Sequence, residues 1–171
     1  MNVVLKPQDI VVVLKLSVTD DPKVSYSSLA ASLGMSPSEV HAAVQRATQA
    51  GLLRPTSRQP NRTALIEFLV HGLKYAFPPD RGSVTRGTPT AHAAPPLVTK
   101  IVQGDELPPV WPDPQGTVRG ETLSPLYESV PVAARNDPKL YECLALVDAL
   151  RSGRARERKL AESMLRDRLA E

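Results

Sequence analysis

The chain has 171 residues, of which 42% are apolar and 23% are charged, and its net charge is +3. This size and composition provide for one compact domain with an appendage or two very small domains, and the charge permits a polyanionic partner. The single cysteine excludes a disulfide framework within the chain and a zinc site built from several thiolates, and an aromatic content of 4% argues against a base-stacking surface.

A first helix is predicted over residues 6–17. Pro7 suits the first helical turn, and the apolar residues Ile10, Val13 and Leu14 follow on one face. The β-branched run at 11–13 disfavours a helix, so this prediction depends on the periodicity and on the segments that follow.

Two further helices follow, separated by a glycine turn. Ser25 can cap a helix over 26–33 that ends at Gly34, a residue suited to a left-handed backbone. Residues 36–39 read Ser-Pro-Ser-Glu, a capping box with proline at the first helical position, and they predict a third helix over 37–50.

This segment resembles the helix-turn-helix of bacterial transcription regulators. Two short helices that meet near a right angle need a small contact residue, a turn with positive φ and an apolar seam. Ala30 and Gly34 meet the first two needs, and the seam consists of Leu29, Leu33, Met35, Val40 and Ala43. With the helix before it and the exit Gly51-Leu52-Leu53-Arg54 behind it, the segment is similar to winged-helix regulators of the broad MarR-like kind. The resemblance implies a winged-helix fold and a double-stranded DNA partner.

The third helix has a polar face that its apolar stripe leaves open. Short and amide side chains can approach base edges in the major groove, and Glu39 is the one carboxylate of this helix. A face that is merely solvated would mix Glu and Lys more freely. Helix-turn-helix folds also serve protein contacts, and a lone exposed histidine is often incidental. The residues that we expect to read bases are Ser36, Ser38, His41, Ala42, Gln45 and Gln49.

Arginines beside turn-forming residues are candidates for phosphate contact. Residues 54–63 contain three, but two prolines and a lack of alternating apolar residues make a poor hairpin, so the wing is either a hairpin or a loop. Residues 81–92 pair two Arg-Gly steps with hydroxyl residues, which suits a minor groove or phosphates, and the alternative is a flexible surface loop. The predicted phosphate contacts are Arg46, Arg54, Arg58, Arg62, Arg81 and Arg86.

The next segments are a helix and a proline-rich stretch. Residues 63–76 have an apolar stripe, so we expect a core helix there with His71 as a structural histidine. Residues 78–131 hold 11 of the 17 prolines, and each proline removes a backbone donor and restricts the residue before it. We therefore expect an irregular segment packed on the domain, with short β pairs at 97–102 and 116–120.

Two helices are predicted near the C-terminus. Asp137 and Pro138 are typical of a cap and a first helical residue, and Ser152-Gly153 marks a break. The apolar faces of these helices are wider than a small core needs, which indicates a surface for a dimer or a protein partner. That predicted surface consists of Leu140, Leu144, Val147, Leu150, Leu160 and Met164.

The sequence has no pattern typical of a catalytic site. It lacks a phosphate-cradling glycine loop, metal-ligand spacing and a nucleophile elbow, and its three histidines fall in separate segments. We therefore expect no enzyme activity, no cofactor and no metal. No apolar run approaches the roughly 20 residues that span a bilayer, and a signal-peptide pattern is lacking, so we expect a cytoplasmic protein without membrane contact.

Together these patterns predict a mainly α protein in three parts. They are a winged-helix-like DNA-binding domain at 1–77, a proline-rich irregular connecting segment at 78–131, and a C-terminal helical hairpin at 132–171 for dimerisation or partner binding. The expected function is sequence-specific regulation of transcription by a dimeric repressor that reads the major groove with helix 37–50. The alternative is an antitoxin-type interaction module, which neutralises a protein partner through its C-terminal helices and regulates its own gene through the N-terminal domain.

Overall fold

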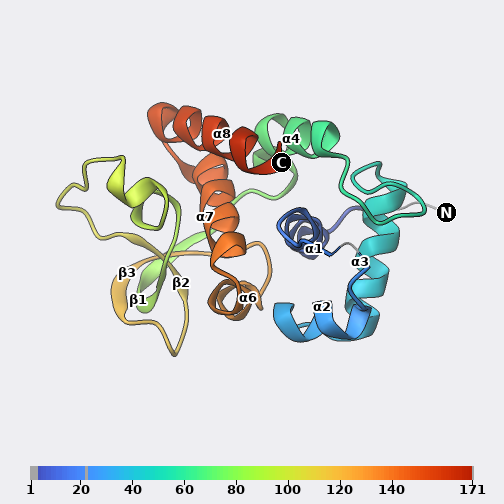
Figure 1. Ribbon diagram of the computed structural model, residues 1–171. Helices are drawn as coiled ribbons and strands as arrows, with labels where there is room; N and C mark the ends of the chain where they lie inside the picture. The colour runs from blue at the N-terminus through green and yellow to red at the C-terminus, as the bar shows by residue number, and fades with distance from the viewer. Residues whose placement is uncertain (1–3, 22, 171) are drawn as a thin grey trace.

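The computed structural model describes residues 4–21 and 23–170, and it is mostly helical, as the sequence predicts. Three N-terminal helices are followed by a helix pair, a small sheet and three further helices (Figure 1). The helices are α1 (Pro7–Ser17), α2 (Tyr26–Leu33), α3 (Pro37–Gln49), α4 (Arg62–His71), α5 (Leu73–Ala76), α6 (Val130–Asn136), α7 (Pro138–Ser152) and α8 (Ala155–Leu169). The strands are β1 (Arg81–Pro89), β2 (Pro109–Pro112) and β3 (Val118–Leu123), and two 3₁₀ turns are η1 (Ala91–Ala93) and η2 (Leu97–Thr99).

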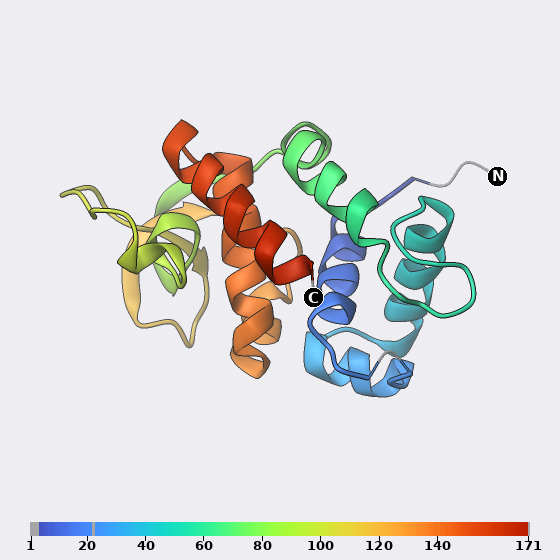
Figure 2. The same ribbon diagram turned by 45° about the horizontal axis from the view of Figure 1, so that its top comes forward.

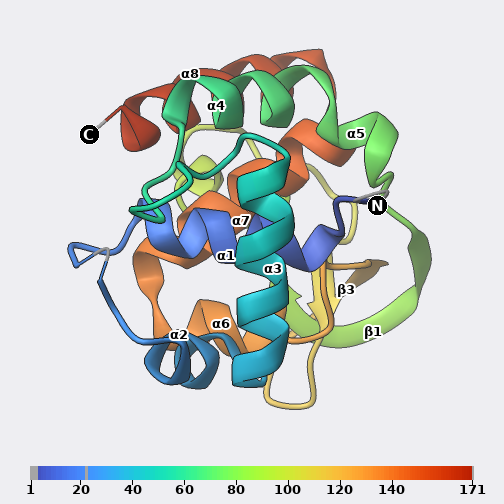
Figure 3. The ribbon, with the colours of Figure 1, turned by 90° about the vertical axis from the view of Figure 1, so that its right-hand side faces the viewer.

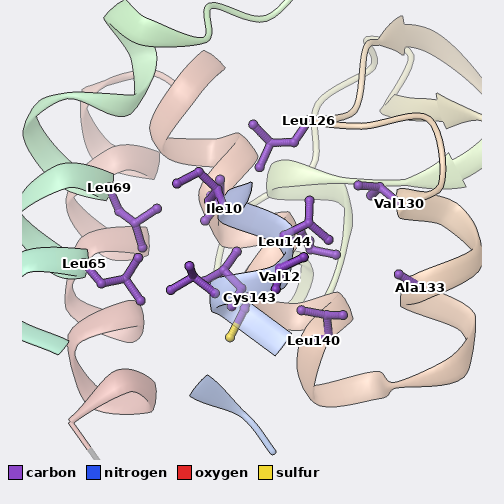
Figure 4. Packing of buried hydrophobic residues seen from close by; sticks show 14 of the residues in the cluster. Ile10, Val12, Leu65, Leu69, Leu126, Val130, Ala133, Leu140, Cys143 and Leu144 are labelled. Atoms are coloured by element: carbon purple, nitrogen blue, oxygen red, sulfur yellow. The ribbon is translucent and has the colours of Figure 1, made fainter. Parts of the chain in front are cut away.

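Helix α1 is buried on every side. Its residues 10–14 are fully inaccessible to solvent, including Val11 and Val12, which the sequence did not place on the apolar face. Helix α3 packs on one side of α1 and α7 on another (Figure 3). Side chains from α4 and α7 lie on either side of Ile10 and Val12 (Figure 4). This burial compensates for the poor helix propensity of the valine run, because a fully buried apolar side chain contributes roughly 1.5–3 kcal/mol.

The two C-terminal helices belong to the same core as α1. Helix α7 packs against α1, α5, α6 and α8, and α8 packs against α4 (Figure 2). The predicted partner surface is therefore wrong for its α7 members, since each of them is at most 5% exposed, and Leu160 and Met164 on α8 are half-buried against the same core. The four α7 residues are Leu140, Leu144, Val147 and Leu150. Their helix has a wide apolar face because it has several neighbours within its own chain.

The lone cysteine lies on this central helix. Cys143 is fully buried, and burial raises the pKa of its thiol to about 12. The thiol is therefore protonated at neutral pH and acts as a small apolar side chain.

The middle of the chain forms a three-stranded mixed sheet. Strand β1 pairs antiparallel with β2 and with β3, and β2 pairs with β3 in parallel over two residue pairs. The Arg-Gly segment 81–92, for which the sequence also allows a flexible loop, is therefore mostly a strand. The β pair expected at 97–102 is wrong, because 97–99 form a 3₁₀ turn, and the one expected at 116–120 corresponds in part to β3.

A buried polar cluster fastens the sheet to α7. The carboxylate of Asp148 accepts hydrogen bonds from Thr90 Oγ1 at 2.7 Å and from Trp111 Nε1 at 2.7 Å, and Arg151 Nη1 donates to its other oxygen at 2.8 Å. Burial raises the pKa of Asp148, although these three donors favour its charged form. These bonds join Thr90 and Trp111 of the proline-rich segment to α7. Along residues 4–21 and 23–170, we find no helix with the length and apolarity that crossing a bilayer requires.

Candidate nucleic-acid interface

Capping residues define the ends of the two helices of the helix-turn-helix, α2 and α3. Ser25 Oγ accepts a hydrogen bond from the amide of Ser28 at the start of α2, and Gly34 ends this helix with a φ of +67°. Ser36 and Glu39 then form a reciprocal capping box at the start of α3, with Pro37 at the first helical position. These are the caps that the sequence predicts, and they set the directions of α2 and α3.

An ion pair between helices orients α3 on α1. Arg46 donates to both carboxylate oxygens of Asp9, from Nε and Nη2, each at 2.9 Å. Asp9 is fully buried and also accepts from the amide of Lys6 at the start of α1. The hydrogen bonds from Arg46 to Asp9 raise the pKa of Arg46 and keep its guanidinium charged. Arg46 therefore has a structural role, which corrects its predicted role as a phosphate contact.

The outward face of α3 is open and polar. Figure 3 looks onto this helix, which lies at the surface across α1. Its apolar stripe of Val40, Ala43, Val44 and Ala47 is buried beneath. Of the residues predicted to read bases, Ala42 is half-buried and the others are exposed, namely Ser36, Ser38, His41, Gln45 and Gln49. Helical geometry brings this set together on one face, and their contact with bases stays a prediction.

Three of these side chains already have contacts within the protein. Ser36 Oγ accepts from the amide of Glu39 and lies 3.1 Å from Ser38 Oγ. The ring of His41 packs edge-on against Tyr26 of α2, with 5.2 Å between ring centroids. The Ser38 hydroxyl shares its bond with another hydroxyl and keeps capacity for a further hydrogen bond, so Ser38 and Gln45 are the better candidates for direct base contacts.

The wing is a short loop closed by one β-bridge. Leu53 and Pro60 form this bridge, and the amide of Arg54 donates to the carbonyl of Gln59 at 2.8 Å. The amide of Asn61 donates to Leu52 at 2.8 Å, and its side chain caps α4. Of the two forms that the sequence left open, the loop is the one observed.

The three arginines of the wing differ in where they point. Arg54 is exposed at the base of the loop, next to the end of α3. Arg58 has a φ of +56°, donates to the carbonyl of Val24 at 2.8 Å and lies 4.9 Å from the centroid of the Tyr26 ring. Its guanidinium joins the wing to α2, which argues against the predicted phosphate contact.

Arg62 also turns into the protein. It donates to the carbonyl of Leu169 at 2.9 Å and to that of Ser17 at 3.3 Å, so it joins α4 to α8 and to the end of α1. Of the wing arginines, Arg54 keeps its predicted role as a phosphate contact.

Arg81 and Arg86 lie far from α3. Both belong to β1, and two views place the sheet and α3 at opposite ends of the molecule (Figures 1 and 2). A straight duplex seated on α3 does not reach them, so they are not phosphate contacts of the same interface. Arg81 donates instead to the carbonyl of Ser152 at 3.0 Å, at the end of α7.

One neighbour of α3 had no signal in the sequence. The hydroxyl of Tyr127, in the segment between β3 and α6, donates to Glu39 Oε1 at 2.5 Å. These residues are 88 positions apart, so no local pattern connects them. In the part of the chain that the structure describes, we find no group of three or more His, Cys, Asp or Glu side chains placed to hold a metal ion.

Comparison with known proteins agrees with this geometry. Residues 17–54 match the family model described as winged helix-turn-helix DNA-binding. The match covers α2, the glycine turn and α3, and it ends at the first residue of the wing. A search of curated proteins and a search of solved structures each found no match. Residues 17–54 are therefore a winged helix-turn-helix segment of the DNA-binding type, as their caps and seam predict.

Proposed function

We propose that this protein regulates transcription by binding double-stranded DNA through α3. The observation that carries the proposal is the open, polar outward face of α3, within a segment that matches a DNA-binding family. The Gln45 amide can make two hydrogen bonds to an adenine edge in the major groove, and Ser38 can contact a base or a phosphate. Arg54 neutralises a phosphate beside the end of the helix.

The proposal also includes a cytoplasmic location, a role as repressor and likeness to MarR-like regulators. A protein bound in the major groove blocks access to a promoter that overlaps its binding site, which supports the role as repressor. The sequence Gly51-Leu52-Leu53-Arg54 after α3 supports the similarity to MarR-like regulators. We expect a homodimer, because two copies present two recognition helices to two half-sites. Its interface lies outside the apolar face of α7, which is used within the chain.

The antitoxin alternative is less well supported. It required an apolar face on the C-terminal helices that stays free for a partner. Most of that face packs against α1 and its neighbours, so a partner has no access to it without unfolding the core. We therefore retain DNA binding as the single proposed function.

Selection of bound duplexes from a random pool tests this proposal. We expect the parent protein to enrich one sequence, with two-fold symmetry if a dimer binds. Replacing Ser38 and Gln45 together by alanine should relax the enriched sequence while leaving the thermal unfolding temperature close to that of the parent, because both side chains are exposed.

Gln115→Ala is the matched control. This exposed glutamine lies between β2 and β3, and the sheet is at the opposite end of the molecule from α3 (Figure 1), so its replacement should leave the enriched sequence unchanged. If the parent enriches no sequence, the proposal is wrong. If the double variant enriches the same sequence as the parent, Ser38 and Gln45 are not the residues that read it.

A further inference from the structure

The segment between β3 and α6 contacts the recognition helix at its first turn. Glu39 Oε2 accepts from the amide of Ser36 at 2.7 Å, and Glu39 Oε1 accepts from the hydroxyl of Tyr127 at 2.5 Å. The bond to the Ser36 amide, followed by the bond to Tyr127, lowers the pKa of Glu39, so this carboxylate is ionised at neutral pH. The bond to Glu39 raises the pKa of Tyr127 to about 12, so its hydroxyl keeps the proton that it donates.

The segment 127–136 also contacts the turn that precedes α3. The side-chain amide of Asn136 donates to the carbonyl of Ser32 near the end of α2, at 3.0 Å. A Cβ atom placed on Gly34 would lie 3.2 Å from Val132 and 3.3 Å from Ser129, so α6 packs directly on the glycine turn. One segment therefore contacts the end of α2, the turn and the start of α3.

The same segment is anchored to the sheet. Arg135 pairs with the carboxylate of Asp113, which also accepts from Thr88 Oγ1 at 2.8 Å and from the amide of Gln115 at 3.0 Å. Burial alone would raise the pKa of Asp113, but these hydrogen bonds and the charge of Arg135 lower it, so the pair stays charged. Helix α6 is thus fixed at the sheet on one side and at the helix-turn-helix on the other.

Electrostatics explains why the carboxylate of Glu39 needs this support. It is the one negative charge on α3, and it lies in the first turn, where the amide groups of a recognition helix approach DNA phosphates. A carboxylate that is free to rotate toward the duplex would repel those phosphates. Hydrogen bonds on both oxygens hold it against the protein instead.

We propose that Tyr127 is a positioning residue for DNA recognition, which holds the Glu39 carboxylate away from the duplex and fixes the first turn of α3. This inference rests on the proposed function, and it adds a residue outside the matched segment 17–54 to the determinants of DNA affinity.

Tyr127→Phe tests the proposal, with Tyr141→Phe as the matched control. Tyr141 also donates one hydrogen bond, to the carbonyl of Pro89 at 2.7 Å, but it lies between α7 and the sheet. We expect Tyr127→Phe to lower affinity for the selected duplex by about tenfold at low salt, the scale of a hydrogen bond to a charged group. Tyr141→Phe should leave this affinity unchanged, even if both variants unfold at similarly lowered temperatures.

The salt dependence of affinity and a second variant distinguish a role of Tyr127 in positioning Glu39 from a general loss of stability. Because screening weakens the repulsion between Glu39 and phosphate, the affinity ratio of parent to Tyr127→Phe should shrink as salt is raised. In a Glu39→Gln background, which removes the negative charge, Tyr127→Phe should change affinity by less than about twofold. A ratio that is independent of salt, or an equal loss in both backgrounds, would overturn the proposal.

A measurement without DNA keeps this inference distinct from the proposed function. Hydrogen exchange of the Ser36 and Glu39 amides should be faster in Tyr127→Phe than in the parent and in Tyr141→Phe, because the capping box has lost its outer support. Unchanged exchange at both amides shows that Tyr127 does not fix this turn. A parent that exchanges as expected but enriches no duplex disproves the proposed function instead.

Discussion

Asp9 and Arg46 show how one side-chain pair can determine where α3 lies. The carboxylate is fully buried, and the guanidinium meets it with two parallel hydrogen bonds. Removing one partner from such a pair leaves a buried charge without compensation, which destabilises a protein far more than the loss of an exposed pair. Arg54 is exposed nearby and has no such role.

These two arginines should therefore respond in opposite ways to replacement. Arg46→Ala should lower the free energy of unfolding by roughly 3 kcal/mol, as measured by urea denaturation. Arg54→Ala should leave that free energy nearly unchanged, but it should weaken binding to all duplexes and reduce the slope of log affinity against log salt by about 1. Equal stability of the two variants would contradict the structural role of Arg46.

For single residues, the sequence predicts helix caps and exposed faces, but it does not predict which distant side chains bond to one another. Ser25, Gly34, Ser36 and Glu39 act within three or four residues of their own positions, so their roles are visible as local patterns. Arg46 and Asp9 are 37 positions apart. An arginine at the edge of a helix can either contact a phosphate or pair with a buried carboxylate, and the fold decides which of these two roles Arg46 has. The hydrogen bond from the Tyr127 hydroxyl to Glu39 spans 88 positions, so the sequence predicts it even less.

Close backbone contacts hold the small sheet together. A Cβ atom on Gly120 of β3 would lie 2.2 Å from the carbonyl oxygen of Pro108 and 2.6 Å from Val110 of β2. A side chain at this position would force β2 and β3 apart. Gly104, in the exposed loop before β2, has no atom within 4 Å of such a Cβ.

Alanine at each of these two glycines should distinguish the effect of close packing on stability from the effect of a less flexible backbone. Gly120→Ala should lower the free energy of unfolding by about 1–3 kcal/mol, the usual cost of overpacking, whereas Gly104→Ala should be nearly neutral. Fluorescence of the single tryptophan, Trp111, can follow the change, because this side chain is fully buried on β2. A Gly120→Ala protein with the stability and emission of the parent would contradict the close approach of these strands.

Elements are predictable where the signal is periodic and capped. Helices α2, α3, α7 and α8 have caps or glycine breaks, and they lie close to their predicted bounds. The sequence of β1 predicts an Arg-Gly-rich loop, because the pairing of this strand with β2 and β3 depends on residues more than twenty positions away. Helix α6 has only seven residues, and much of its burial comes from contacts with α2 and α7, so it has no strong signal of its own.

At the scale of the whole molecule, α1 joins the parts that the proline content separates. One apolar cluster contains residues of α1, α3, α4, α7 and α8, together with Trp111 of the sheet. The division into domains at 77 and 131 stays a prediction, and the position of α1 makes it testable. Without α7, the part of α1 that packs against it would face water.

A fragment of residues 1–77 should therefore fail to fold cooperatively. We expect it to lack a sharp thermal transition by circular dichroism and to bind a dye specific for exposed apolar surface, whereas the full chain shows the transition and binds little dye. The fragment keeps α2, α3 and the wing, so any loss of folding is due to the missing C-terminal neighbours of α1, α2, α4 and α5. A sharp transition near the temperature of the full chain would establish 1–77 as an independent domain.

The position of α1 also has a consequence for synthesis of the chain. The ribosome makes Pro7–Ser17 about 120 residues before it reaches α7, a delay on the order of 10 s at typical elongation rates. During this interval the run Val11-Val12-Val13, which favours extended conformations, lacks the neighbours that later enclose it. The nascent chain thus exposes this apolar segment early and buries it late, so α1 can reach its native packing only after α7 has been translated.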